Sequence, residues 1–295
     1  MAELENLDLK SRYYIKDLIV LVKNEIGFDK TLSIILFGSL ASKQNDNTGI
    51  SDCDVLIIIR DDVPKKKLKN LEKFFCSLEI KHDFREYNNS FSKKIMDVVQ
   101  RSTGMFVSHF VSIRSNWENA LFHKIFNVNK VFSTLFAPTK IVLSSVIDNS
   151  LIIYGDDLRP IIKEMLNIPC TDMIKSIIMN LIITIFSIII TPLKNLNSPK
   201  YLLESIKWSL RASNYYLFKD SVSLYQIVNR FLMLEKPQSR NKAKKYYSKF
   251  LELRKNPRRE IKFIFQTFFR ILKIHRKAIF YKKSIILRDK ASSID

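Results

Sequence analysis

The sequence predicts an α+β protein with a turn-rich, mixed first half and an all-α second half. All five glycines lie at or before residue 155, so the last 140 residues contain none. Chains use glycine for tight turns and positive φ, and its absence therefore favours long helices. The first half also carries short apolar runs of strand length, whereas the second half repeats apolar residues at helical spacing. We expect a first domain over residues 1–158 and a basic helical domain over residues 159–295.

The elements of the first half follow from its periodicity. Residues 11–26 place apolar side chains one helical turn apart and end before Gly27, where a C-terminal cap is expected. The isoleucine-rich runs 32–37 and 55–59 have the length and composition of buried strands. Pro64 then opens a helical pattern, as proline does at the first turn of a helix. Three further segments complete this half: a helix at 92–101, a third strand within 105–114, and a short apolar run at 151–154.

The second half consists of helical patterns and carries most of the positive charge. Residues 240–295 hold 18 Lys and Arg against 4 Asp and Glu, which is +14 of the total of +20. Such a segment indicates that the chain binds polyanions, and one expected contact is with nucleic acid through residues 240–290. The patterns lie at 161–167, 172–191, 200–218, 221–235 and 240–290, with a break expected at Pro257.

Composition bounds the class of protein. A chain of 295 residues with 46% hydrophobic and 26% charged residues is long enough for about two folded domains, which excludes wholesale disorder. Cys53, Cys76 and Cys170 are scattered without CxxC spacing, which argues against a disulfide framework and against a zinc cluster. The N-terminus carries acids where a signal peptide is basic. We therefore expect a cytoplasmic protein.

One segment has the composition of a membrane span. Residues 176–193 contain 18 consecutive uncharged and mostly apolar positions, the lower limit for crossing a bilayer. Asn180, several Ser and Thr residues and the lack of aromatic residues at both ends argue against a span. We expect a helix buried in the core, with a membrane not among the partners of the chain.

The clearest chemical signal lies between the first two predicted strands. The first strand runs into Gly38 and Ser39, and after 12 further residues Asp52 and Asp54 lead into the second. Side chains alternate between the two faces of a strand, so the two aspartates share one face and Cys53 points to the other. The sequence therefore predicts a pair of neighbouring carboxylates.

Two carboxylates at the mouth of an apolar strand require a compensating cation. Mg²⁺ is the expected ion, because it binds one or two carboxylates together with substrate phosphates. We expect Asp52 and Asp54 to be catalytic metal ligands, with Gly38, Ser39 and Ser51 holding the phosphates of a nucleotide. Such a site suits phosphoryl or nucleotidyl transfer, in which positioning and charge neutralisation supply most of the rate.

The order of strand, Gly-Ser, gap, Asp-x-Asp and second strand, over residues 30–60, resembles the DNA polymerase beta-like nucleotidyltransferase superfamily. The segment IYGDDL, residues 153–158, looks like the YGxDL segment of stand-alone members, including aminoglycoside adenylyltransferases. The resemblance implies a small mixed β-sheet with flanking helices, two Mg²⁺ ions with a bound NTP, and pyrophosphate release. It also implies a helical C-terminal domain that covers the cleft. ATP is the expected NTP, and the hydroxyl acceptor stays open between a small molecule, a protein and RNA.

The sequence departs from this superfamily at the third carboxylate, which usually lies on a later strand beside the first two. The predicted strand within 105–114 contains no acid, and His109 is its residue with acid–base capacity. We take His109 as the candidate catalytic base, with a partly buried structural histidine as the alternative. Asp83 and Glu86 are further candidates if residues 81–87 form the strand. The missing acid leaves a catalytically degenerate nucleic-acid-binding protein as the alternative function.

Three weaker signals lie in the second half. Lys207 and Lys200, near Trp208, are expected to reach the triphosphate. Arg270 and His275 form an R-x4-H pair, as in helical ribonucleases, but His275 falls on the apolar side of its helix, which argues against nuclease chemistry. The opposite, basic side of that helix predicts a solvated face, with binding to phosphates or to an acidic membrane as alternatives.

Overall fold

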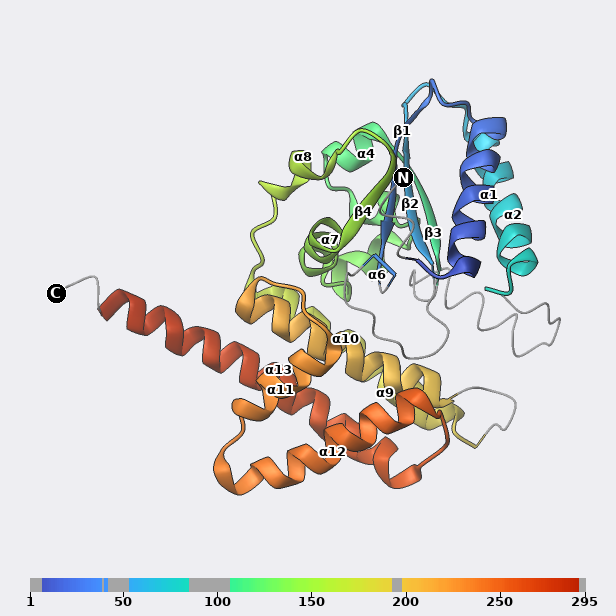
Figure 1. Cartoon of the computed structure of the whole chain (residues 1–295). Coiled ribbons are helices and arrows are strands. Elements are labelled where there is room, and N and C mark those ends of the chain that lie inside the picture. The colour runs from blue at the N-terminus through green and yellow to red at the C-terminus, as the bar shows by residue number, and fades with distance from the viewer. Residues whose placement is uncertain (1–6, 39, 42–52, 85–106, 193–197, 292–295) are drawn as a thin grey trace. The chain divides into compact units, whose positions relative to one another are not determined.

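The fold of this chain comes from a computed structural model (Figure 1). It describes residues 7–38, 40–41, 53–84, 107–192 and 198–291. The predicted helix at 92–101 lies outside the described residues.

The described residues divide into two compact units. The first unit contains residues up to 133 and takes up the chain again at 146–166, while the second contains residues 134–145 and everything from 167 onward. The chain therefore enters the second unit at residue 134, returns to the first unit at residue 146, and continues in the second unit from residue 167. The predicted domain boundary after residue 158 stays a prediction.

A mixed four-stranded sheet forms the centre of the first unit. Its strand order is β3-β2-β1-β4, with β1 antiparallel to both of its neighbours and β2 parallel to β3. All four strands fall where apolar runs predicted them. The strands are β1 (Thr31–Phe37), β2 (Asp54–Ile59), β3 (His109–Ile113) and β4 (Ser150–Gly155).

Two helices cover one face of this sheet, α1 (Leu9–Glu25) and α2 (Lys65–Lys81) (Figure 1). Asp8 begins α1 by accepting a hydrogen bond from the backbone N–H of Ser11, and Gly27 follows the helix with φ +92°. Their apolar stripes pack on alternate strand residues, and burial of these side chains is the main source of stability in this unit. The cluster includes Tyr14, Leu18, Leu71, Phe75, Ile34, Leu36, Val55 and Ile57.

Five short helices follow β3, and the four between β3 and β4 were not predicted. Phe110 points to the face of the sheet opposite α1 and α2, where its ring lies 5.0 Å from that of Phe126. The Trp117 indole donates to the carbonyl of Leu158 and ties the segment before α8 to this layer. The helices are α4 (Arg114–Glu118), α5 (Phe122–Ile125), α6 (Lys130–Leu135), α7 (Thr139–Asp148) and α8 (Arg159–Lys163).

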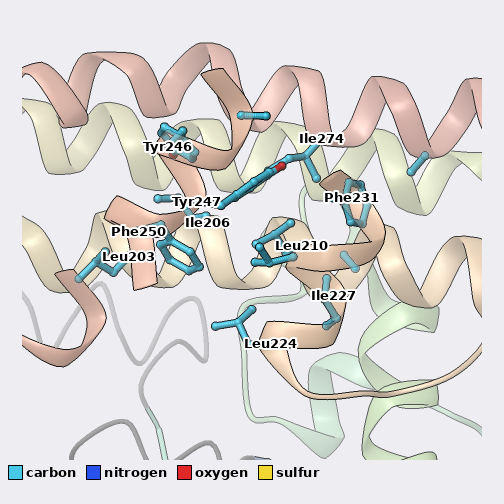
Figure 2. Close-up of a cluster of buried hydrophobic side chains, with 14 of the residues drawn as sticks. Leu203, Ile206, Leu210, Leu224, Ile227, Phe231, Tyr246, Tyr247, Phe250 and Ile274 are labelled. Atoms are coloured by element: carbon cyan, nitrogen blue, oxygen red, sulfur yellow. The ribbon is translucent and has the colours of Figure 1, made fainter. Parts of the chain in front are cut away.

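The second unit is helical, as predicted, and its elements follow the predicted apolar patterns with a break around Pro257. A single cluster of buried side chains joins its helices (Figure 2). Most of α10 is buried, including Ile206 and Leu210, so α10 is the central helix of this unit. The helices are α9 (Cys170–Ile190), α10 (Ser198–Phe218), α11 (Leu224–Met233), α12 (Pro237–Lys255) and α13 (Ile261–Ala291).

The apolar helix α9 is not enclosed, contrary to our expectation for residues 176–193. By length and composition it could cross a membrane, yet only 39% of its most apolar window is buried. It buries small polar residues against the unit and exposes isoleucines such as Ile182 and Ile189. The expectation was wrong because α10, which is mixed in polarity along the sequence, takes the central position.

Candidate functional site

The paired strand ends of β1 and β2 bring Gly38 and Asp54 together. Phe37, the last residue of β1, is the register partner of Asp54, and Gly38 follows at once with φ +80°. A Cβ atom on Gly38 would overlap Oδ2 of Asp54 and lie 3.2 Å from its Cγ. Position 38 therefore requires glycine for two reasons: the backbone has a positive φ, and the Asp54 carboxylate occupies the space of a Cβ atom.

The alternation of β2 fixes the direction of this carboxylate. Cys53 and Val55 are buried in the cluster under α1 and α2, as predicted, so Asp54 points to the opposite face. Asp54 is half-buried at the start of an otherwise buried strand. A carboxylate in that position, beside bare backbone, is a donor of the type that Mg²⁺ prefers.

The other predicted residues of this loop, Ser39, Ser51 and Asp52, lie outside the described residues. Within the part that the structure describes, no group of three His, Cys, Asp or Glu side chains could hold a metal ion. Of the predicted carboxylate pair the structure describes Asp54, and the pairing with Asp52 stays a prediction.

His109 lies on the other face of the sheet from Asp54. Its register partner on β2 is Val55, whose side chain points toward α1 and α2, and partners on adjacent strands share a face. There Nδ1 of His109 lies 2.9 Å from Oε1 of Glu79, and its ring lies 4.7 Å from that of Phe75. Both side chains of the pair are about nine-tenths buried. The structure thus brings His109 to a carboxylate of α2 and not to Asp54.

Glu79 was missed by the sequence reasoning, although a signal for it exists. Leu71 and Phe75 form the buried stripe of α2, and one further helical turn along that stripe leads to Glu79. An acid that continues an apolar stripe needs a buried polar partner, and His109 is one such partner of Glu79.

Asp83 is not on a strand. It follows α2 in a turn with φ +53°, and its N–H donates to the carbonyl of Ile80. The alternative strand at 81–87 is therefore wrong for residues 81–84, because the apolar pattern of α2 continues as helix up to Lys81. Glu86 lies outside the described residues.

Gly155 of the YGDDL segment lies at the opposite end of β1 from Gly38. Gly155 pairs with Ser33, and a Cβ there would overlap the carbonyl oxygen of Leu32, so only glycine allows this approach. The second acid of the segment, Asp157, binds Arg159 through both carboxylate oxygens, at 2.6 and 2.7 Å. These hydrogen bonds hold the pKa of Asp157 below its usual value despite partial burial.

Arg159 is a further residue that sequence reasoning did not single out. From α8 its guanidinium donates to the carbonyl of Ser150, 2.7 Å away. Ser150 is the β4 partner of Phe37 at the strand end next to Gly38. The Arg159 guanidinium, which Asp157 binds, therefore lies beside β4, two strands away from Asp54 and at the same end of the sheet.

Lys207, predicted to bind phosphate, lies in the second unit and forms an ion pair with Glu204. Glu204 also accepts a hydrogen bond from Arg254, at 3.1 Å. Burial lowers the pKa of Lys207, against the opposing influence of Glu204. A role for Lys207 or Lys200 in phosphate binding stays a prediction.

The R-x4-H pair of α13 is built into the interior of the second unit. The Arg270 guanidinium binds Glu235 at 3.1 Å, and its side chain is 9% exposed. His275 is fully buried, and Nε2 lies 3.0 Å from the hydroxyl of Ser176. Neither group can reach an RNA backbone from this position, which removes the structural basis for a nuclease at this pair.

The basic face of α13 is solvated only in part, because Lys262 and Gln266 are exposed whereas Arg270 is buried. Lys273 and Lys277, like Arg270, direct their charges to Glu235, at 2.9 and 2.8 Å for the two lysines. The Glu235 side chain is 1% exposed. Three cations of this face thus form ion pairs with one buried carboxylate.

Comparison with known proteins shows that the chain is similar in fold to a solved structure. No family model matches the chain, and no curated protein matches it. Among solved structures, the chain is similar to the spectinomycin adenyltransferase AAD(9) from Enterococcus faecialis, determined with ATP and spectinomycin. The TM-score is 0.52 at 10% sequence identity, over 90% of this chain and 98% of that chain. The small mixed sheet followed by a helical region is thus the fold of that structure, as the sequence predicted.

Proposed function

We propose that the chain is a nucleotidyltransferase that moves an NMP group from an NTP to a hydroxyl acceptor and releases pyrophosphate. The observation that carries the proposal is the contact between Gly38 and Asp54, a carboxylate held against bare backbone at the end of two paired strands. The likeness to an ATP-bound adenyltransferase supports it, because the likeness extends over nearly the whole length of both chains.

In this proposal Asp54, together with Asp52, holds Mg²⁺. The bound ion would neutralise charge that develops on the phosphates during transfer. Gly38 leaves the strand end open for the phosphates of the NTP, with Ser39 and Ser51 as hydrogen-bond donors to their oxygens. ATP is the proposed donor.

We propose a small molecule with a free hydroxyl as the acceptor, since AAD(9) was determined with spectinomycin. The two proteins are only 10% identical in sequence, so the acceptor need not be the same compound. The base that takes the hydroxyl proton stays open, because His109 lies on the other face of the sheet from Asp54.

Nucleotide binding tests this proposal directly. ATP affinity is measured by calorimetry with and without Mg²⁺ for the wild type, for Asp54→Asn and for Asp62→Asn. Asp62 is an exposed aspartate of the same unit that pairs with Lys30, and it serves as the matched control. We expect Mg²⁺ to strengthen ATP binding in the wild type and in Asp62→Asn, and to have little effect in Asp54→Asn. Equal affinities in all conditions would reject the metal site.

Group transfer is tested with each labelled NTP and a panel of hydroxyl-bearing small molecules. Release of pyrophosphate that depends on both NTP and acceptor supports the proposal. Binding of nucleic acid that weakens steeply with salt, without any transfer and independently of Asp54, would favour the degenerate binding protein instead.

A further inference from the structure

The long helix α13 turns an apolar stripe outward. Phe265, Phe269 and Phe280 are 56%, 71% and 60% exposed, and Ile261 and Leu272 on the same side are exposed as well. Residues 265, 269, 272 and 280 fall on one face at helical spacing. Large aromatic side chains that are exposed to this extent on one helix face are typical of an interaction site.

The charges of α13 fix this orientation. Arg270 and Lys277 point inward to the buried carboxylate of Glu235, and His275 is bonded to Ser176 of α9. Turning the phenylalanines inward would break all of these bonds and leave Glu235 without its cations. The outward direction of the apolar stripe is therefore determined by the packing of the unit.

A second helix of the unit, α9, also exposes apolar side chains, and it buries polar ones. The buried side of α9 carries Ser176, Thr184 and Ser187, and the last two bind the Ser205 hydroxyl and the Ser198 carbonyl of α10. Isoleucines cover the outer side, and Ile182 and Ile189 are 45% and 66% exposed. In water a helix lowers its free energy by the opposite arrangement, so the outer side of α9 is suited to apolar surroundings.

Positive charge accompanies the stripe of α13. Arg276 and Lys283 are exposed and continue the same spacing, and the Arg276 guanidinium lies 5.4 Å from the centre of the Phe280 ring. The sequence has no Asp or Glu from residue 261 to residue 288. The outer side of α13 is thus apolar and cationic, without a carboxylate to oppose an anion.

We propose that this surface docks on a lipid bilayer that contains anionic phospholipids, with the phenylalanines among the acyl chains and the two cations at the headgroups. An amphipathic helix with aromatic and basic residues binds such interfaces through buried apolar area together with charge. A second copy of the chain fits less well, since a formal charge of +20 on each copy would oppose the contact. The inference does not depend on nucleotidyl transfer.

Sedimentation of the full chain with vesicles tests the proposal. One set of vesicles is pure phosphatidylcholine, and the other contains equal parts of phosphatidylcholine and phosphatidylglycerol. We expect the wild type to sediment with the second set and to remain in the supernatant with the first. Phe265→Ser/Phe269→Ser should lower the apparent affinity at least about tenfold, because two aromatic side chains no longer insert. Arg276→Gln/Lys283→Gln should lower it about tenfold through lost charge.

The matched control is Tyr225→Ser/Met233→Ser, which removes two exposed apolar side chains from α11. It should bind like the wild type, and circular dichroism should show that every variant is folded. The proposal is overturned if the wild type stays in the supernatant with both sets of vesicles. It is also overturned if Phe265→Ser/Phe269→Ser sediments with the phosphatidylglycerol vesicles as the wild type does. A wild-type dimer in analytical ultracentrifugation that Phe265→Ser/Phe269→Ser converts to a monomer, without vesicle binding, overturns it in favour of a second copy.

Discussion

His109 Nδ1 lies 2.9 Å from Oε1 of Glu79, under α2 and on the face of the sheet opposite Asp54. The pair links the first residue of β3 to the last helical turn of α2. Both side chains are about nine-tenths buried. The hydrogen bond between them therefore offsets part of the free-energy cost of burying their polar atoms. The geometry favours a structural histidine over a catalytic base.

Replacing His109 distinguishes these two roles. We expect His109→Gln to lower the free energy of unfolding by about 1–3 kcal/mol, because the buried hydrogen bond between His109 and Glu79 is lost. Turnover per folded molecule should stay within about twofold, whereas removal of a general base typically costs 10²- to 10⁴-fold. Urea denaturation and single-turnover rates measure the two quantities. A rate loss in that larger range, with unchanged stability, would restore His109 as the base.

Substitution of Gly38 should affect the site more than the fold. Gly38→Ala places a Cβ on the carboxylate of Asp54 and at a positive φ, so Asp54 must move. We expect ATP affinity in the presence of Mg²⁺ to fall about tenfold or more, as it does when a metal ligand loses its support.

Gly27→Ala is the matched control for Gly38→Ala. Gly27 also has a positive φ, but its added Cβ would meet only the end of the exposed Asp29 side chain. Both variants should lose about 1 kcal/mol of unfolding free energy, and Gly27→Ala should bind ATP normally. Equal ATP affinities for the two variants would contradict the placement of Asp54 in the site.

The strands and long helices were predictable because each has an apolar pattern of its own. Isoleucine runs locate β1 and β2, and a repeat of one apolar residue per turn locates α1 and α2. The four short helices between β3 and β4 have no such repeat, since helices of four to ten residues show too few turns for a period to emerge. Their positions depend on tertiary contacts such as that of Trp117 with Leu158.

Partner choice, by contrast, could not be read from local sequence. The Asp-x-Asp spacing predicts the direction of Asp54, which local alternation determines. The pairing of His109 with Glu79 joins residues 30 positions apart. Likewise the outer face of α9 was predicted as core, because periodicity identifies an apolar side but not the surroundings that the side meets.

Glu235 should be among the most sensitive positions of the second unit. Its carboxylate is buried against Arg270, Lys273 and Lys277. Burial by itself raises the pKa of Glu235, but hydrogen bonds from Lys277, Lys273 and Ser239 outweigh it and lower the pKa to about 2. Glu235→Gln leaves these cations without their counter-charge, and we expect a loss of about 3–5 kcal/mol in unfolding free energy.

Glu252→Gln serves as the control for that substitution. Glu252 also binds cations, Lys249 and Arg258, but its side chain is 45% exposed. Solvent screening should limit its effect to less than about 1 kcal/mol. Thermal and urea denaturation compare the two variants, and similar losses for both would show that the Glu235 cluster contributes no more than a surface ion pair.

The stability of the second unit should depend on pH through His275. Burial lowers the pKa of this imidazole to about 4, and the neutral ring donates from Nδ1 to the carbonyl of Ile271 and accepts at Nε2 from Ser176. In the unfolded chain the pKa is about 6.5. Between these values the unfolded state binds a proton that the folded state excludes, so unfolding free energy rises with pH across this window.

Acidification from pH 6.5 to pH 4 should therefore cost up to about 3 kcal/mol through this one residue, with no further contribution from it above pH 6.5. His275→Gln abolishes the titration, so its unfolding free energy should vary less steeply between pH 6.5 and pH 4 than that of the wild type. The carboxylate of Glu235 loses its contribution only below about pH 4.5, as its lowered pKa is approached, which separates the two effects. The half-buried His123 provides the control His123→Gln, and denaturation across the pH range measures all three proteins. Parallel curves for the wild type and His275→Gln would mean that His275 is protonated in the folded state, contrary to its burial.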